Sequence, residues 1–223
     1  MTALLATPWS GVVDLLVPAL WETVRLVAVV MAVVVVLGGP LGLLIFNSSS
    51  HGLTPHRAVH FSISWIANLG RSLPFLVLMA ALVPVTFAVF GTTIGFRAAI
   101  IPMAVAGVAF FARITENAVR EVPRELMDVG LASGSSLRQI VFGIQVREAV
   151  PGLVAGFTLN LIAMIEYSAI AGAIGSGGIG YVAVNYGYQR FDQHVMLACI
   201  GVLIAIVQVI QFAGDRAVRA LSH

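Results

Sequence analysis

No Arg, Lys, Asp or Glu interrupts Leu26–Phe46, Phe75–Ile94 or Val195–Gly214, and each of these stretches is about 20 residues long. A helix of that length crosses a bilayer, and a bilayer offers no water to the backbone of an open sheet or coil. The composition agrees, with 59% hydrophobic and 10% charged residues, whereas soluble domains carry roughly 25% charged residues. The sequence therefore predicts an all-α integral membrane protein.

Two shorter uncharged runs, Ala98–Ala112 and Ala149–Ile165, can also span a bilayer if their flanks contribute. We therefore expect about five transmembrane helices. In the second of these predicted helices, near 58–82, Arg71 falls near the middle and Pro84 near the end. The predicted helices lie near 20–46, 58–82, 97–116, 149–172 and 193–214.

The sidedness of the loops follows from the arginines, because cytoplasmic loops are enriched in Arg and Lys and this chain has no lysine. With the N-terminus outside, three arginines lie on the outer side (Arg25, Arg97 and Arg190) and Arg71 lies within the membrane. The other eight are then cytoplasmic: Arg57, Arg113, Arg120, Arg124, Arg138, Arg147, Arg216 and Arg219. We expect an extracytoplasmic segment over 1–19, a transmembrane domain over 20–214 and a cytoplasmic tail over 215–223.

A polar, arginine-bearing island lies at Val122–Gly152, between apolar segments. Pro123 suits the first turn of a helix, where a missing N–H costs nothing. Glu125 and Asp128 follow near the positive end of that helix, where a carboxylate is stabilised. Ser133-Gly134 is a plausible stop, because glycine adopts the left-handed conformation that ends helices.

A second short helix is predicted to follow the glycine. Ser136 and Gln139 match a capping box, and apolar residues then recur with helical spacing at Leu137, Ile140, Val141 and Ile144. A helix–glycine–helix hairpin between membrane spans is a surface for docking a protein in the cytoplasm. The pattern therefore indicates a transporter subunit that is driven by a partner.

The hairpin resembles the EAA loop of bacterial ABC importer permeases, with the pattern E-A-A, three residues, G, then I-x-L-P. Asp128-Val129-Gly130 stands at E-A-A, Gly134 at the glycine, and Ile144–Arg147 at I-x-L-P without its proline. Over about residues 20–221 the chain resembles the permease of the D/L-methionine importer. The matching motifs are Arg71-Ser-Leu-Pro-Phe75, Gly91-Thr-Thr-Ile-Gly95, Glu116-Asn117-Ala118, Tyr167-Ser168-Ala169, Gly175–Gly180, Tyr186-Gly187-Tyr188 and Gln211–Arg216.

This resemblance implies the type I ABC importer permease fold in the bacterial cytoplasmic membrane. It implies a homodimer of the permease, two ATPase subunits that bind ATP and Mg, and an extracytoplasmic binding protein. The chain contains no GxxxxGK[ST] phosphate-binding loop, so we expect a translocation subunit without enzyme activity or a cofactor of its own. No basic patch is interleaved with aromatic residues outside the spans, so we expect no nucleic-acid partner. The implied ligand is methionine, L or D, or a close derivative, and the alternative is a different small polar solute.

The resemblance also implies a coupling helix near Pro123–Ser133, within a loop over 117–150, that docks on the ATPase. An ordinary amphipathic helix on the membrane surface is the alternative. The residues assigned to ATPase coupling are Pro123, Glu125, Asp128, Gly130, Ser133 and Gly134.

The segment Gly152–Ala173 is rich in small residues, which allow close helix packing, but it also contains Glu166. A carboxylate is costly in lipid and normally faces a cavity or a partner. Glu166 stands where the methionine-importer pattern has glycine. It can pair with Arg71 or a backbone group, or it can contact the substrate. The candidate pathway or gate residues are Arg71, Asn160, Met164, Glu166, Tyr167, Ser168 and Ile170, of which Met164 can equally serve as packing.

Four glycines between the last two spans allow the backbone to fold tightly against a partner. The binding-protein docking residues are assigned as Gly175, Gly177, Gly178 and Gly180, and a plain turn is the alternative.

Three other classes of function are less well supported. A secondary transporter would need a coupling-ion site and usually inverted repeats, and we find no repeat. An intramembrane enzyme is disfavoured, because the spans contain no Ser/His pair, HExxH motif or paired carboxylates. His51, His56 and His60 lie on the first cytoplasmic loop, and His56 and His60 have i, i+4 spacing, but without a third clear ligand or any carboxylate there we expect no metal site.

Overall fold

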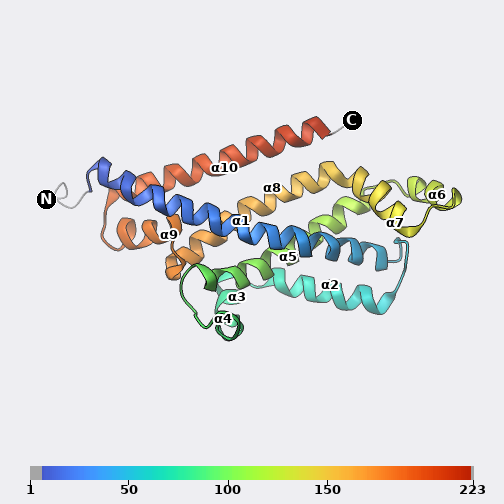
Figure 1. Cartoon of the computed structure of the whole chain (residues 1–223), viewed down its shortest axis with the longest axis horizontal. Coiled ribbons are helices and arrows are strands. Elements are labelled where there is room, and N and C mark those ends of the chain that lie inside the picture. Colours follow the sequence, from blue (N-terminus) through green and yellow to red (C-terminus); the bar gives the residue numbers. More distant parts are fainter. Residues whose placement is uncertain (1–6, 222–223) are drawn as a thin grey trace. The chain divides into compact units, whose positions relative to one another are not determined.

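The computed structural model describes residues 7–221, and every regular element in that part of the chain is helical. The elements labelled η are π-helical segments that continue directly from an α-helix. The bounds in chain order (Figure 1) are α1 Trp9–Ser48, α2 Arg57–Ser72, α3 Phe75–Ala81, α4 Val83–Phe90, α5 Phe96–Arg120, α6 Arg124–Ala132, α7 Leu137–Ile140, η1 Val141–Gln145, α8 Val146–Ala171, η2 Gly172–Ser176, α9 Gly178–Val182, η3 Ala183–Tyr188 and α10 Gln193–Leu221.

Within residues 7–221, four helical stretches are long and apolar enough to cross a membrane, and a fifth exists if α2 and α3 form one bent span. The prediction of a single helix over 58–82 is wrong, because α2 ends at Ser72 and α3 begins at Phe75. Pro74 explains the break. It lacks an N–H and disfavours a helical conformation in the residue before it. The four uninterrupted stretches are Trp9–Ser48, Phe96–Arg120, Leu137–Ser176 and Gln193–Leu221.

The first and last spans are longer than predicted. α1 already begins at Trp9, because Val12, Leu16 and Ala19 continue its buried face with helical spacing. Asp14, which interrupts the apolar run in the sequence, lies on the exposed side of the same helix. At the other end of the chain, α10 continues to Leu221, through the residues that we expected to form a tail.

The chain divides into two compact units. Unit 1 comprises Met1–Ala32, Leu73–Ala106 and Leu161–Gln211, and unit 2 comprises Val33–Ser72, Gly107–Asn160 and Phe212–His223. The long helices α1, α5, α8 and α10 each contribute one segment to each unit.

Each unit has its own apolar core. In unit 1, α1 packs with α9 and α10 through Val12, Leu16, Ala19, Ile179, Val182, Val195 and Cys199. In unit 2, one cluster joins the end of α1 to α5–α8 through Phe46, Ala118, Val119, Val122, Met127, Ile140 and Ala149. A second cluster in unit 2 consists of Ile45, Ala67 and Ala112.

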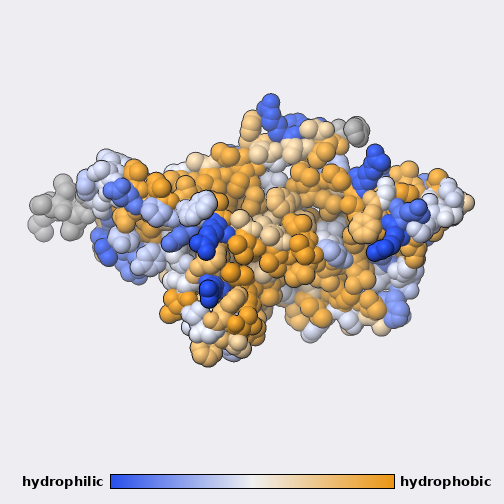
Figure 2. Space-filling model, viewed as in Figure 1, coloured by the Kyte–Doolittle hydropathy of each residue, from blue (hydrophilic) through white to orange (hydrophobic). Residues whose placement is uncertain are grey.

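Apolar residues cover much of the visible surface (Figure 2). In the most apolar 18-residue stretch of α10, only 11% is buried inside the protein. Among the exposed side chains of α10 are Leu197, Ile204 and Val209. Soluble monomers rarely expose large contiguous apolar patches to water. An apolar surface of this kind is typical of a protein that spans a membrane.

Candidate functional site

The helix predicted for ATPase coupling is present as α6, Arg124–Ala132. A Schellman motif closes its C-terminal end, with Ser135 N–H donating to Gly130 O at 3.1 Å and Gly134 N–H donating to Leu131 O at 3.0 Å. Gly134 has a φ of 74°, which glycine adopts without the steric penalty of a side chain. The predicted helix end at Ser133-Gly134 is confirmed.

The start of α6 differs slightly from the prediction. Pro123 has an extended ψ of 130° and is the N-cap, rather than a residue of the first turn. Glu125 does lie in the first turn, where the positive end of the helix dipole stabilises its negative charge. Asp128 lies 4.0 Å from Arg124, and because both side chains are exposed this ion pair contributes little to stability.

The capping box after the glycine is confirmed. Ser136 N–H donates to Gln139 Oε1 at 2.8 Å, and Gln139 N–H donates to Ser136 Oγ at 3.4 Å. The helix that follows was predicted to be a separate short one, which is wrong. α7 passes through η1 directly into α8, so the second arm of the hairpin is the start of a membrane-length helix.

α6 has a buried and an exposed face. Met127 and Gly130 are buried, and a Cβ added at Gly130 would lie 2.9 Å from Ile144 Cδ1 and 3.2 Å from Ile140 Cγ1. The two arms therefore approach closely because Gly130 has no side chain. Three other side chains of α6 are apolar and nevertheless exposed, which suits contact with a protein partner. They are Leu126, Val129 and Leu131.

A reciprocal pair of amides is buried beneath α6. Gln145 Nε2 donates to Asn47 Oδ1 at 3.0 Å, and Asn47 Nδ2 donates to Gln145 Oε1 at 3.0 Å. Gln145 is fully buried, and its Nε2 also contacts Met127 Sδ at 3.2 Å. Each amide satisfies the other, which offsets the cost of burying them. The pair ties together the end of α1, η1 and α6.

The predicted pathway residues at the centre of α8 are mostly engaged within their own unit. Met164 is fully buried, as expected for a packing residue. Ser168 is buried and its hydroxyl donates to Ile165 O at 2.7 Å in the same helix. The Tyr167 ring stacks on Phe75, with 4.4 Å between the ring centroids.

Glu166 and Ile170 are instead exposed, at a cavity of about 460 Å³ between α8 and α10. Asn160 is fully buried in unit 2, where its Nδ2 donates to Gly107 O at 3.0 Å. Its Oδ1 has no partner among the described residues. Arg71 lies exposed in the last turn of α2, also in unit 2. Arg71 and Glu166 thus belong to different units, and their pairing stays a prediction.

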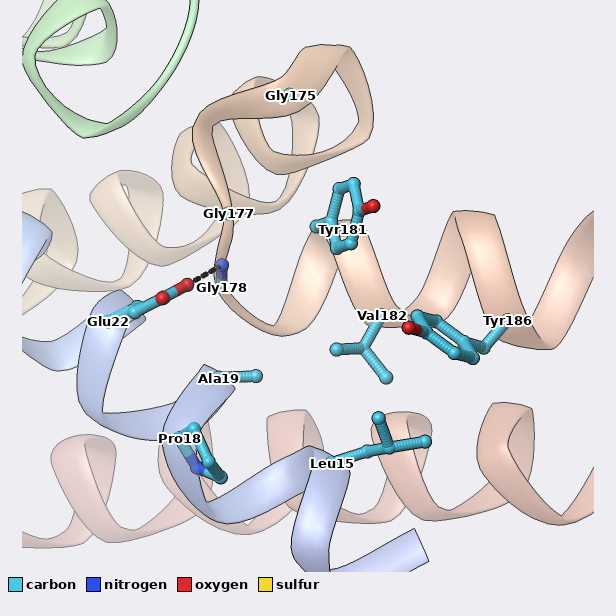
Figure 3. Close-up of a pocket in the computed structure, with 10 residues that line it drawn as sticks. All are labelled: Leu15, Pro18, Ala19, Glu22, Gly175, Gly177, Gly178, Tyr181, Val182 and Tyr186. Atoms are coloured by element: carbon cyan, nitrogen blue, oxygen red, sulfur yellow. Dashed lines mark hydrogen bonds between the residues drawn. The ribbon is translucent and has the colours of Figure 1, made fainter. Parts of the chain in front are cut away.

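The segment predicted for binding-protein docking is folded against α1 in unit 1 (Figure 3). Gly178 N–H donates to Glu22 Oε2 at 2.7 Å, and Ile179 N–H donates to Thr23 Oγ1 at 3.0 Å. Two side chains of α1 therefore cap the first turn of α9. The glycines are needed for this path, because the φ angles of Gly175, Gly177 and Gly178 are 106°, 87° and 77°.

Close packing explains the remaining glycine of this segment. A Cβ added at Gly180 would lie 2.1 Å from Ala169 O. Beside the segment is a cavity of about 350 Å³, with Glu22 on one side and the rings of Tyr181 and Tyr186 among its other lining residues (Figure 3). The geometry is that of a rigid loop rather than a loose connection.

A further polar cluster lies where α10 begins. Asp192 is buried and caps α10, accepting from His194 N–H at 3.1 Å and Val195 N–H at 3.2 Å. Its other oxygen accepts from Thr7 N–H at 2.8 Å and from the Thr7 hydroxyl at 2.5 Å. Burial by itself raises the pKa of Asp192, but the hydrogen bonds from Thr7, Val195 and His194 outweigh burial, and the net pKa is lowered.

The family of the chain follows from comparison with known proteins. The family model described as "Binding-protein-dependent transport system inner membrane component" matches residues 38–223. The chain belongs to this family. Two curated relatives are the probable D-methionine transport system permease protein MetI of Vibrio cholerae, 40% identical over 94% of this chain and 93% of the relative, and MetI of Escherichia coli K12, 38% identical over 94% and 96%.

Solved structures agree with this membership. An inward-facing structure of the MetNI methionine ABC transporter contains a chain that is 38% identical, with a TM-score of 0.91 over 94% of this chain and 97% of that one. An amino acid ABC transporter crystallised with histidines is 17% identical, with a TM-score of 0.77, and supports the fold alone. This inner membrane component therefore has the predicted type I permease fold, and it is a translocation subunit rather than an enzyme.

Several residues of this binding-protein-dependent permease were not anticipated as functional. Asn47 and Gln145 join three elements, Glu22 and Thr23 cap α9, and Asp192 anchors the start of α10. The sequence feature that could have identified these residues is a polar side chain inside an apolar run or at its edge. Among residues 7–221, no group of three or more His, Cys, Asp or Glu side chains is placed to hold a metal ion.

Proposed function

We propose that this chain is the permease subunit of an ATP-driven importer for methionine, in the L or D form, or for a close derivative. The observation that carries this proposal is similarity along nearly the whole chain to permeases named for D-methionine transport. The similarity to a chain of a methionine ABC transporter structure supports it.

The working assembly in this proposal contains two copies of the permease and two ATPase subunits, and the ATPases bind ATP and Mg. An extracytoplasmic binding protein delivers the ligand. The N-terminus lies outside and the C-terminus in the cytoplasm, because this orientation places eight arginines on the cytoplasmic side and three outside.

The coupling element in this assembly is the hairpin built around α6. Its exposed apolar residues Leu126, Val129 and Leu131 provide the surface that docks on the ATPase. The Schellman motif at Gly134 and the close contact at Gly130 make the hairpin stiff. The Asn47–Gln145 pair then transmits movement of α6 to α1 and to the start of α8. This linkage favours a coupling role over that of a passive surface helix.

The substrate pathway in this proposal follows α8, and Glu166 is its most informative residue. The carboxylate is exposed beside a cavity, so it is accessible to a ligand. A contact with the ligand's ammonium group would select amino acids over other small solutes. The glycine segment Gly175–Gly180 provides the docking surface for the binding protein, because its capped and close-packed backbone offers a fixed shape.

The proposal is tested by radiolabelled uptake in bacterial cells that lack their own methionine importer. Cells expressing this permease with its cognate ATPase and binding protein should accumulate L- or D-methionine, and unlabelled methionine should compete. A polar solute of another class, such as a sugar, should not compete. If another solute is imported and methionine neither enters nor competes, the ligand assignment is wrong.

A further inference from the structure

A basic cavity of about 620 Å³ lies in unit 2, where α1 ends, α2 begins and α5 ends. Its lining includes Arg57, Arg120, His56 and His60, together with the serine stretch Ser48–Ser50. The transport mechanism proposed above uses none of these residues. Their chemistry is that of a site for an anion.

The charges around the cavity do not cancel. Arg120 is paired with Glu116 at 2.5 Å, and Glu116 is also paired with Arg113. Glu116 is buried, so this single carboxylate is shared by two arginines. Arg57 makes no side-chain hydrogen bond or ion pair with the described part of the chain. The lining of the cavity itself contains Arg57 and Arg120 and no carboxylate, so its net charge is positive.

The histidines add hydrogen-bond donors. His56 Nδ1 accepts from Val59 N–H at 3.3 Å, and because a backbone N–H can only donate, the proton of the neutral ring lies on Nε2. His60 Nδ1 lies 3.0 Å from Ile45 O, and because a carbonyl can only accept, this nitrogen is the donor. His56 Nε2–H and the Arg57 guanidinium are therefore both left as donors for a ligand at the cavity.

An exposed apolar strip leads away from the cavity along α2. Phe61, Trp65 and Leu69 follow Arg57 at intervals of four residues, and their exposed fractions are 68%, 57% and 45%. Side chains with this spacing lie on one side of a helix. A basic group at the helix end followed by an apolar strip matches a molecule with an anionic head and an apolar tail.

We infer that this cavity binds the phosphate of an anionic phospholipid, whose acyl chains lie along the Phe61–Leu69 strip. The chain is an inner membrane component, so the ends of its spans lie at the depth of lipid headgroups. Basic pockets between transmembrane helices bind anionic headgroups in this way. Only the choice of leaflet depends on the proposed orientation, which places the cavity on the cytoplasmic side.

Native mass spectrometry of the full-length permease tests the inference, with phosphatidylglycerol and phosphatidylethanolamine of identical acyl chains as probes. Phosphatidylglycerol should bind more tightly than phosphatidylethanolamine. Arg57→Gln should weaken its binding about fivefold, the effect of one arginine near a lipid surface, and Arg57→Lys should retain most of it. Trp65→Gln should weaken both lipids. Arg219→Gln, at the far end of the chain in α10, is the matched control and should change neither.

Equal binding of the two lipids, or equal losses in Arg57→Gln and Arg219→Gln, would overturn the inference. Displacement of phosphatidylglycerol by micromolar inorganic phosphate would show a site for free phosphate instead. Loss of lipid when the ATPase subunit is present would show that the cavity is a protein interface. Lipid binding is measured without transport, so a failed methionine-uptake experiment leaves this result intact.

Discussion

Gly134 is the residue on which the hairpin geometry depends most directly. Its φ of 74° is left-handed, and an added Cβ would meet nothing within 4 Å. The cost of Gly134→Ala is therefore purely conformational, about 1–2 kcal/mol. We expect this variant to insert normally but to associate more weakly with the ATPase and to show less substrate-stimulated ATP hydrolysis.

Gly143 offers a matched control, because a Cβ there also meets nothing within 4 Å but φ is not positive. Gly143→Ala should keep full association. Gly134→Asn should recover part of the loss, since asparagine tolerates the left-handed region. Identical ATPase activity in Gly134→Ala and Gly143→Ala would show that the reversal at Gly134 is not part of coupling.

Asp192 makes the start of α10 sensitive to acid. Its pKa is lowered in the folded protein, because hydrogen bonds from Thr7, Val195 and His194 outweigh burial. A lowered carboxylate pKa contributes stability that is fully present above the unfolded pKa of about 4 and is lost as pH falls through the folded pKa. Wild type should therefore have a higher Tm than Asp192→Asn at pH 6–8, and the difference should shrink as pH falls below about 4.

Differential scanning fluorimetry of the detergent-purified permease checks this pH profile. Asp14→Asn, at an exposed position of α1, serves as the control for a general effect of removing one carboxylate. A Tm difference between wild type and Asp192→Asn that stays constant down to pH 3 would contradict the assignment.

At the scale of elements, the all-helical class and the turn after α6 were predicted well from the sequence, whereas the helix bounds were predicted poorly. The hairpin was predictable because Gly134, Ser136 and Gln139 act through local backbone geometry. The length of α1 was not, since Asp14 lowers local hydropathy although it lies on the exposed face of a continuous helix. Sequence periodicity does not reveal which face a charge will occupy before the packing is known.

The π-helical segments and the buried amides escaped prediction for a different reason. η1 brings Gln145 beneath α6, against Asn47, which lies 98 positions earlier in the chain. No local rule pairs residues at that separation. The same holds for the caps that Glu22 and Thr23 place on α9.

The amide pair gives an element-scale prediction. Asn47→Leu should leave the Gln145 amide buried and unsatisfied, at a cost of about 1–3 kcal/mol. Gln145→Leu should cost a similar amount, whereas the double variant should cost less than the sum, because neither amide remains unpaired. Thermal unfolding of the purified permease measures all three, with the exposed Gln189→Leu as control. Additive losses would show that the two amides act independently.

At the scale of the whole molecule, the charges at Arg71 and Glu166 test how the two units act together. Both are costly near lipid unless neutralised. If they pair within a subunit or across the dimer, Arg71→Gln and Glu166→Gln should each lower stability or uptake, and the double variant should recover part of the loss. If Glu166 contacts the ligand, Glu166→Gln should change ligand preference at unchanged membrane levels. Additive losses with unchanged preference would exclude both roles.

The central claim is that this chain moves methionine only when a partner ATPase drives it. Uptake of radiolabelled methionine into proteoliposomes tests this claim most directly, with the permease alone compared with the permease, ATPase and binding protein together. We predict ATP-dependent accumulation by the complete set and none by the permease alone. ATP-dependent uptake by the permease alone, or the absence of methionine uptake by an assembled and ATP-hydrolysing complex, would contradict the account.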